Sequence, residues 1–313
     1  MAGNLASVAS GEVAYLYGSS DAAFSTVVDT LSNIEDVTLS GNGANYVVGS
    51  SGANVIVGGT GVDTITTGAG NDTIYGSTGA DIIDGEAGTD TYVTSSTQVA
   101  ANIEGAGTGT STGLVINLGS TAITKASVLS VTSANLAGNL ASVASGEVAY
   151  LYGSSDAAFS TVVDTLSNIE DVTLSGNGAN YVVGSSGANV IVGGTGVDTI
   201  TAGAGNDTIT GAGGADVIDA GAGNDTLVYL LTADLFSGNA EVDTSFAGGI
   251  GTDTLQVGTT GTAFVIANND IWTGVTGVET ISYVANTATV TIDLDVTAYT
   301  AGIRTVNVSA GTA

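Results

Sequence analysis

The chain has 313 residues, with 30 acidic and 2 basic side chains, a formal net charge of −28, 48 Gly, and no Cys, His or Pro. The missing side chains exclude Ser-His-Asp and Cys-His nucleophiles, Cys/His metal centres and disulfides, so we expect no enzyme. Lys125 and Arg304 are the only basic residues, which leaves no basic surface for nucleic acid.

The composition is nevertheless that of a folded chain. Hydrophobic residues make up 43% and charged residues 10%, whereas disordered chains combine low hydrophobicity with dense charge. No apolar run reaches the ~18 residues of a membrane helix, so we expect no membrane span. The segment after Met1 has neither the basic nor the apolar region of a cleaved N-terminal export signal.

Two copies of one sequence block organise the chain, because residues 2–66 are identical to residues 137–201. Alternating apolar and polar residues, as in STGLVINLGS and ATVTIDLDV, predict half-buried strands between the repeats. The predicted order is a β-rich lead-in (1–39), a first array (40–93), a β-rich connection (94–174, in which 137–174 repeats 2–39), a second array (175–228) and a β-rich C-terminal segment (229–313).

Each array consists of six nonapeptides, and the first reads SGNGANYVV, GSSGANVIV, GGTGVDTIT, TGAGNDTIY, GSTGADIID and GEAGTDTYV. The fourth residue is always Gly, the sixth is Asp or Asn, and the eighth is apolar. The Gly-rich half favours a turn, and the other half favours a short strand with one inward side chain. Two units then close one turn of a parallel β-solenoid, so that units eighteen residues apart stack.

The acids at the sixth position should therefore lie above one another, and like charges at that spacing destabilise the stack unless a cation lies between them. Carboxylate and carbonyl oxygens in a Gly turn are hard ligands, which suit Ca²⁺. The alternative is that these turns favour Asp without binding an ion. The predicted stacks are Asp63 over Asp81, Asp72 over Asp90, Asp198 over Asp216 and Asp207 over Asp225.

The units GGTGVDTIT and GAGNDTIY resemble the GGxGxDxUx nonapeptide of RTX calcium-binding β-roll proteins. In that family each ion lies between two stacked loops and is bound by their carbonyl oxygens and Asp carboxylates. The resemblance implies Ca²⁺ sites at Gly59, Gly61 and Asp63 with Gly76, Thr78 and Asp81; at Gly68, Gly70 and Asp72 with Gly85, Ala87 and Asp90; at Gly194, Gly196 and Asp198 with Gly211, Gly213 and Asp216; and at Gly203, Gly205 and Asp207 with Ala220, Ala222 and Asp225.

Departures from the motif define weaker candidates. Asn45, Asn54, Asn180 and Asn189 replace Asp in the first two units of each array, which makes these units either weaker Ca²⁺ sites or plain Asn-capped turns. The fragment GGIGTDTLQ around Asp253 lies out of the nine-residue register, so we expect a lone turn, with a cation shared with Asp243.

The phrases LSNIEDVTLS and TGVETISYV resemble strands that flank such arrays in bacterial S-layer proteins and large RTX surface proteins. The resemblance implies an extracellular or cell-surface protein, exported by a type I system without a cleaved N-terminal signal. We expect a secreted calcium-binding structural protein that self-assembles into a surface layer, filament or matrix fibre. Its expected partners are further copies of itself, head-to-tail or lateral, with cell-surface polysaccharide as a second candidate. The alternative is an adhesin or a carbohydrate- or ice-binding module of a larger surface protein.

Overall fold

The structure is a computed structural model in which every named element of the described residues is a β-strand, which confirms the all-β fold class. No helix among these residues is long and apolar enough to cross a membrane. The chain divides into two compact units, Met1–Thr173 (unit 1) and Leu174–Ala313 (unit 2). The described residues are 12–17, 23–30, 35–39, 43–59, 61–76, 79–94, 111–124, 142–152, 158–231, 235–237, 240, 241, 243, 245–259, 263–266, 274–283, 290–292, 298, 299 and 302–308.

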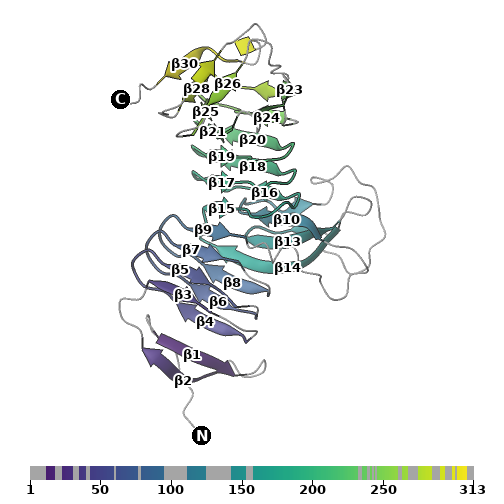
Figure 1. Ribbon diagram of the computed structural model, residues 1–313. Helices are drawn as coiled ribbons and strands as arrows, with labels where there is room; N and C mark the ends of the chain where they lie inside the picture. The colour runs from purple at the N-terminus through teal and green to yellow at the C-terminus, as the bar shows by residue number, and fades with distance from the viewer. Residues whose placement is uncertain are drawn as a thin grey trace. The chain divides into compact units, whose positions relative to one another are not determined.

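Unit 1 contains two main sheets, and Figure 1 shows their short strands stacked above one another. The first sheet has the order β2 (Ala23–Thr30), β1 (Glu12–Tyr17), β4 (Asn45–Val48), β6 (Thr64–Thr66), β8 (Asp81–Asp84), β14 (Ala158–Ser167), β13 (Glu147–Tyr152), β10 (Ser111–Asn117). The second has the order β3 (Asp36–Thr38), β5 (Val55–Val57), β7 (Thr73–Tyr75), β9 (Thr91–Val93), β15 (Asp171–Thr173). A small ladder joins β11 (Ile123–Thr124) to β12 (Ser142–Val143).

Unit 2 repeats this plan with its own two ladders. One has the order β16 (Tyr181–Val183), β18 (Thr199–Ala204), β20 (Val217–Ala222), β24 (Ser245–Ala247), β27 (Val275–Thr276). The other has the order β17 (Val190–Val192), β19 (Thr208–Thr210), β21 (Thr226–Tyr229), β25 (Thr254–Val257), β28 (Thr280–Tyr283), β30 (Thr305–Val308). Two short pairs join β22 (Phe236–Ser237) to β23 (Ala240–Glu241) and β26 (Phe264–Ile266) to β29 (Val290–Ile292).

The strand register confirms the predicted eighteen-residue turn. Within the arrays the strands pair in parallel, for example Val47 with Ile65 and Ile191 with Ile209. The eighth-position side chains of all units are 8% exposed or less, so they form the thin apolar core between the two ladders. The boundaries predicted at residues 40, 94, 175 and 229 stay predictions, because the division into compact units falls elsewhere and does not test them.

Glycine is required where the loops stack. Gly70 has φ +127°, and a Cβ there would lie 2.7 Å from the backbone of Gly52 in the preceding turn. Gly205 has φ +123°, and its Cβ would meet Gly187 at 2.5 Å. The invariant fourth-position Gly therefore allows both a left-handed backbone and close contact between loops.

The GGIGTDTLQ fragment is a further stacked unit, so the prediction of a lone turn is wrong. Its strand β25 pairs in parallel with β21, with Thr254 opposite Thr226. Asp253 follows Asp225 by 28 residues, because the segment between them is longer than in the array. The segment still returns the chain to the same ladder, which the nine-residue register in the sequence did not show.

Candidate metal centres

The acids and amides at the sixth position of the repeats form two columns in each unit. In unit 1 the first column is Asn45, Asp63, Asp81 and Asp164, and the second column is Asn54, Asp72, Asp90 and Glu170. In unit 2 the first column is Asn180, Asp198, Asp216 and Asp243, and the second column is Asn189, Asp207, Asp225, Asp253 and Glu279.

Each member of a column except the last donates its backbone N–H to the carboxylate of the next member. Asp63 N–H donates to Asp81 Oδ1 at 2.8 Å, and Asp72 N–H donates to Asp90 Oδ1 at the same distance. The second column of unit 1 ends at Glu170, whose Oε2 accepts the N–H of Asp90 at 2.9 Å. The carboxylates thus hold successive turns together, in the stacks that the sequence predicts.

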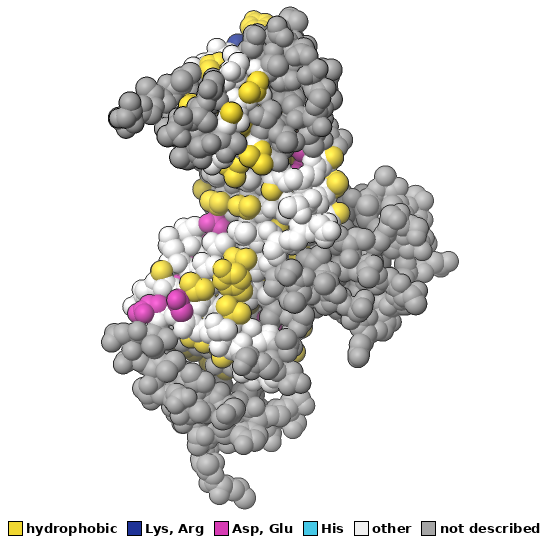
Figure 2. Space-filling view, in the orientation of Figure 1, with side chains coloured by type: hydrophobic (Ala, Val, Ile, Leu, Met, Phe, Trp, Pro, Cys, Tyr) yellow, Lys and Arg dark blue, Asp and Glu magenta, His cyan; other side chains and the backbone are white. Residues whose placement is uncertain are grey.

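These carboxylates are buried, which is unusual for so acidic a chain. Asp63, Asp90 and Asp198 have no exposed surface, and Asp72 and Asp207 are 1% exposed. Figure 2 accordingly shows few acidic side chains on the described surface in this view, although the chain has 30 acidic residues. Buried carboxylates require compensation by donors or by a cation.

The second column of each unit leaves one carboxylate oxygen without a donor. The Oδ2 atoms of Asp72 and Asp90, and those of Asp207, Asp225 and Asp253, are buried and have no hydrogen-bond partner. In the first column the corresponding oxygens of Asp63 and Asp198 accept the N–H groups of Gly59 and Gly194. A hard cation satisfies such orphan oxygens, so the residues of the second column fit Ca²⁺.

The electrostatics point the same way. Burial raises the pKa of Asp90 to about 6, and repulsion from Asp72 and Glu170 adds to the rise. Burial, with repulsion from Asp225, raises the pKa of Asp207 to about 6. Burial also raises the pKa of Asp198, Asp225 and Asp253. The raised pKa values show that ionisation of these carboxylates is unfavourable unless a positive charge lies nearby.

Acidic side chains alone do not complete a site. Among the described residues, no group of three or more acidic side chains lies close enough together to hold a metal ion. Backbone carbonyl oxygens of the loops would have to supply the remaining ligands, as the RTX resemblance implies. Of the predicted carbonyl ligands, those of Ala87 and Ala222 accept the N–H groups of Gly70 and Gly205. Because a carbonyl has two lone pairs, these bonds leave one for a metal. Thr78 lies outside the described residues.

The Asn members of the columns make the contacts of plain turns. Asn45 Nδ2 donates to Asp63 Oδ1 at 2.8 Å, and Asn180 Nδ2 donates to Asp198 Oδ1 at the same distance. Asn54 and Asn189 each accept a backbone N–H from the Ser four residues earlier, at 2.8 Å. These amides serve their own loops and their Asp neighbours, which favours the Asn-capped turn over the weak Ca²⁺ site.

Three column members fall outside the predicted set, namely Asp164, Glu170 and Glu279. Asp243 stacks on Asp216, whereas Asp253 stacks on Asp225, so the two acids that were expected to share a cation lie in different columns. A signal was present for two of the missed acids, because Asp164-Thr-Leu and Glu279-Thr-Ile repeat the Asp-Thr-Ile triplet of the arrays. Asp164 and Asp243 also accept the hydroxyl protons of Tyr92 and Tyr229.

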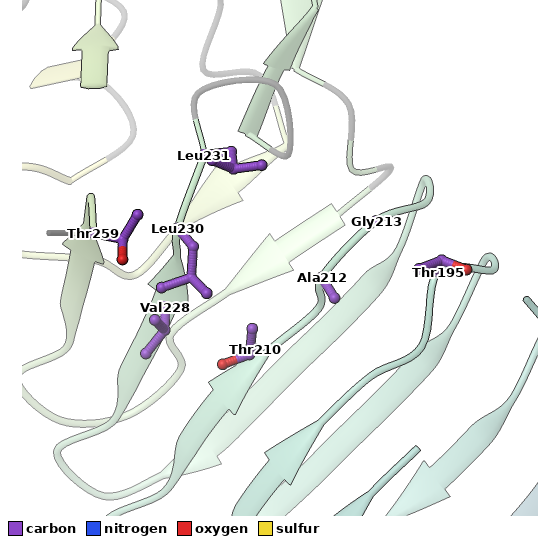
Figure 3. A pocket seen from close by; sticks show the side chains of 8 residues that line it. All are labelled: Thr195, Thr210, Ala212, Gly213, Val228, Leu230, Leu231 and Thr259. Atoms are coloured by element: carbon purple, nitrogen blue, oxygen red, sulfur yellow. The ribbon is translucent and has the colours of Figure 1, made fainter. Parts of the chain in front are cut away.

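An apolar groove of ≈ 410 Å³ lies on unit 2. Figure 3 shows Val228, Leu230 and Leu231 along one side of it, with Thr210 and Ala212 from the neighbouring strand and loop. No acidic or basic side chain lines the groove.

The fold and the columns define a calcium-binding β-roll. Consistent with this, the model of the RTX calcium-binding nonapeptide repeat matches the chain in four copies, at residues 39–74, 57–92, 174–208 and 192–227. The chain therefore carries RTX calcium-binding repeats in both arrays. Comparison with curated proteins found no match.

Proposed function

We propose that the chain is a secreted calcium-binding structural protein that self-assembles into a cell-surface layer, filament or matrix fibre. The observation that carries the proposal is the set of buried carboxylate oxygens without donors in loops that match a calcium-binding repeat. The chain has no His or Cys and two basic residues, which supports a structural rather than a catalytic role.

The proposed ligands are the stacked loops of both arrays. The Oδ2 atoms of Asp72 and Asp90, and those of Asp207 and Asp225, would hold Ca²⁺ together with the carbonyl oxygens of the loops that the sequence predicts. Asp253 would extend the second column of unit 2 by one more site. Bound Ca²⁺ would supply the positive charge that the buried carboxylates require.

Calcium binding of this kind supports function outside the cell. Extracellular modules bind Ca²⁺ in roughly the 10⁻⁴–10⁻³ M range, so their sites fill only where Ca²⁺ is abundant. Ion binding then contributes to folding free energy. RTX repeat proteins are generally exported by type I systems, and we propose the same route for this chain.

Self-assembly is supported by the sheet edges. Within unit 1, the described part of the chain ends one ladder at β2 and the other at β3. Edge strands present unpaired backbone groups that pair readily with another chain. Stacked repeats with open edges grow in one dimension, which suits filaments and layers.

Electron microscopy of the purified chain, with about 5 mM Ca²⁺ and then with excess chelator, tests the proposal. We expect ordered filaments or sheets that dissolve on chelation. Asp207→Asn/Asp225→Asn should assemble only at higher Ca²⁺, whereas Asp219→Asn, which removes an exposed charge, should assemble as the parent chain does. Discrete particles under both conditions would contradict assembly as the intrinsic function.

The apolar groove favours a second candidate function, a ligand-binding or adhesin module. Leu230 and Leu231 are each 44% exposed at its edge, where an apolar ligand would bury them. Saturable binding of a surface glycan, lost in Leu230→Ser, would support this function if no assembly is seen.

A further inference from the structure

One sequence occupies two different environments in unit 1. Residues 12–38, which we call the first cap, are identical to residues 147–173, the second cap. Both form the same antiparallel hairpin, in which Glu12 pairs with Thr30 and Glu147 pairs with Thr165. The two hairpins therefore share one register, and their neighbours differ.

The second cap closes the end of the first array. Its β14 pairs in parallel with β8, and its β15 pairs in parallel with β9. Side chains reinforce this contact, because Asp164 and Glu170 accept the N–H groups of Asp81 and Asp90 at 3.0 and 2.9 Å. Asn168 Nδ2 adds a bond of 2.8 Å to Asp84. The end of the array thus binds this sequence specifically.

The first cap presents the same edge uncovered. Among the described residues, β2 pairs only with β1, and β3 pairs only with β5. Asp36 is exposed and Val37 is partly exposed, whereas their counterparts Asp171 and Val172 are 9% and 0% exposed. The chain therefore holds two identical caps for the single array end formed by β8 and β9.

We propose that the first cap of one molecule replaces the second cap on the first array of another copy of this chain. This inference rests on the proposed self-assembly and names its interface: β2 and β3 of one molecule pair with β8 and β9 of the next. Asp29 and Glu35 are the sequence counterparts of Asp164 and Glu170, so they provide the same two carboxylates. Each molecule then presents one uncovered cap and one array end, which links molecules head to tail.

The balance between the two arrangements depends on protein concentration. Because the caps are identical, the array end gains the same hydrogen bonds from either one. The second cap has only the advantage of its covalent connection, and flexible connections give effective concentrations of about mM. Exchange of an identical element is a low-cost route to oligomers. It should therefore be favoured where the chain is concentrated, as at a surface.

Disulfide trapping tests the exchange in the full chain, which has no Cys of its own. Thr173 lies opposite Val93 in the β15–β9 pair, so Thr38, the counterpart of Thr173, should lie opposite Val93 of a second molecule. Thr38→Cys, carrying a tag, is mixed with untagged Val93→Cys in chelator, refolded with Ca²⁺ at rising protein concentration, and oxidised. We expect a disulfide-linked heterodimer whose yield rises with concentration.

Two controls make the result decisive. Val62→Cys is exposed on the same array but out of register, so it should give far less heterodimer with Thr38→Cys. Val93→Cys/Thr173→Cys should lock the second cap in place and lose the assemblies seen by electron microscopy. Filaments without the heterodimer, or equal trapping at Val62, would overturn this interface while leaving self-assembly intact. If neither filaments nor the heterodimer are found, both proposals are overturned.

Discussion

The two carboxylate oxygens of each second-column aspartate have different roles. One oxygen accepts the backbone N–H of the turn eighteen residues earlier, as in Asp207 with Asn189 at 2.7 Å. The other oxygen, in the second columns, is buried without a donor. An Asn at the same position has a single, uncharged amide oxygen and an NH₂ group in place of the second oxygen, which explains why Asp and Asn are not equivalent in these columns.

Asp207→Asn should therefore weaken Ca²⁺ binding while keeping the turn. We expect roughly a tenfold loss of affinity, because Ca²⁺ sites are tuned by the number of charged ligands. Titration calorimetry of the full chain measures this loss. Asp219→Asn is the matched control, since Asp219 is exposed and lies outside the columns. Equal losses in both variants would mean that net charge, not ligation, sets the affinity.

The pKa shifts predict opposite pH responses with and without calcium. The pKa values of Asp90 and Asp207 are raised to about 6 in the folded, metal-free chain, above the ordinary Asp value of 3.8. The folded state then binds more protons than the unfolded state. The stabilisation that these two carboxyl groups contribute is therefore complete below about pH 4 and is lost as pH rises to about 6. Calcium requires the ionised carboxylates, so its affinity should fall below pH 6.

Denaturant unfolding at pH 4.5 and 7.5, in chelator and in Ca²⁺, checks both responses. We expect the metal-free chain to be more stable at the lower pH and the calcium-bound chain at the higher pH. The same pH dependence in chelator and in calcium would show that the column acids are not the ones that titrate.

At the scale of elements, the nine-residue period was sufficient to predict the arrays. It gave the turns, the inward eighth position and the stacking of Asp63 on Asp81 and Asp72 on Asp90, because local Gly and apolar spacing determine all three. It missed Asp164 and Glu170, which reach the columns from a segment more than 70 residues away in sequence. No local period encodes a contact that a hairpin makes with a distant array end.

Because the core is thin, we expect the free energy of unfolding to depend strongly on each eighth-position residue. Ile191 is fully buried between the ladders of unit 2, so Ile191→Ala should destabilise it by about 2–5 kcal/mol. The neighbouring Val190 is 44% exposed, and Val190→Ala should change stability by about 0.5 kcal/mol or less. Denaturant unfolding in saturating Ca²⁺ compares the two. Similar effects would show that the inward position carries no special packing.

A buried hydroxyl adds to the contacts between the second cap and the first array. Tyr92 is fully buried and donates its hydroxyl proton to Asp164. Tyr92→Phe keeps the ring but removes a donor to a buried carboxylate, which should cost about 1–3 kcal/mol. Tyr75→Phe is the control, because Tyr75 is 38% exposed. Hydrogen exchange at β14 and β15 should report faster opening in the first variant only.

At the scale of the whole molecule, the net charge of −28 opposes compaction. In chelator at low salt we expect an expanded chain, measured as a larger radius of gyration by X-ray scattering. Salt at about 1 M shortens the Debye length to ~3 Å and should reduce the expansion, because it screens the repulsion. The calcium-bound chain should change little with salt. An equal response in both states would show that the ions do not neutralise the charge.

The bonds from backbone N–H groups to carboxylates within the columns all run in one direction, which favours one order of folding for the turns. The N–H of each turn donates to a carboxylate that comes later in the sequence, from Asn189 through Asp207, Asp225 and Asp253 to Glu279. If the chain folds from its C-terminus, each new turn docks on a folded turn whose carboxylate acceptor is already in place. If the chain folds from its N-terminus, the same N–H groups have no carboxylate acceptor until the following turn has folded.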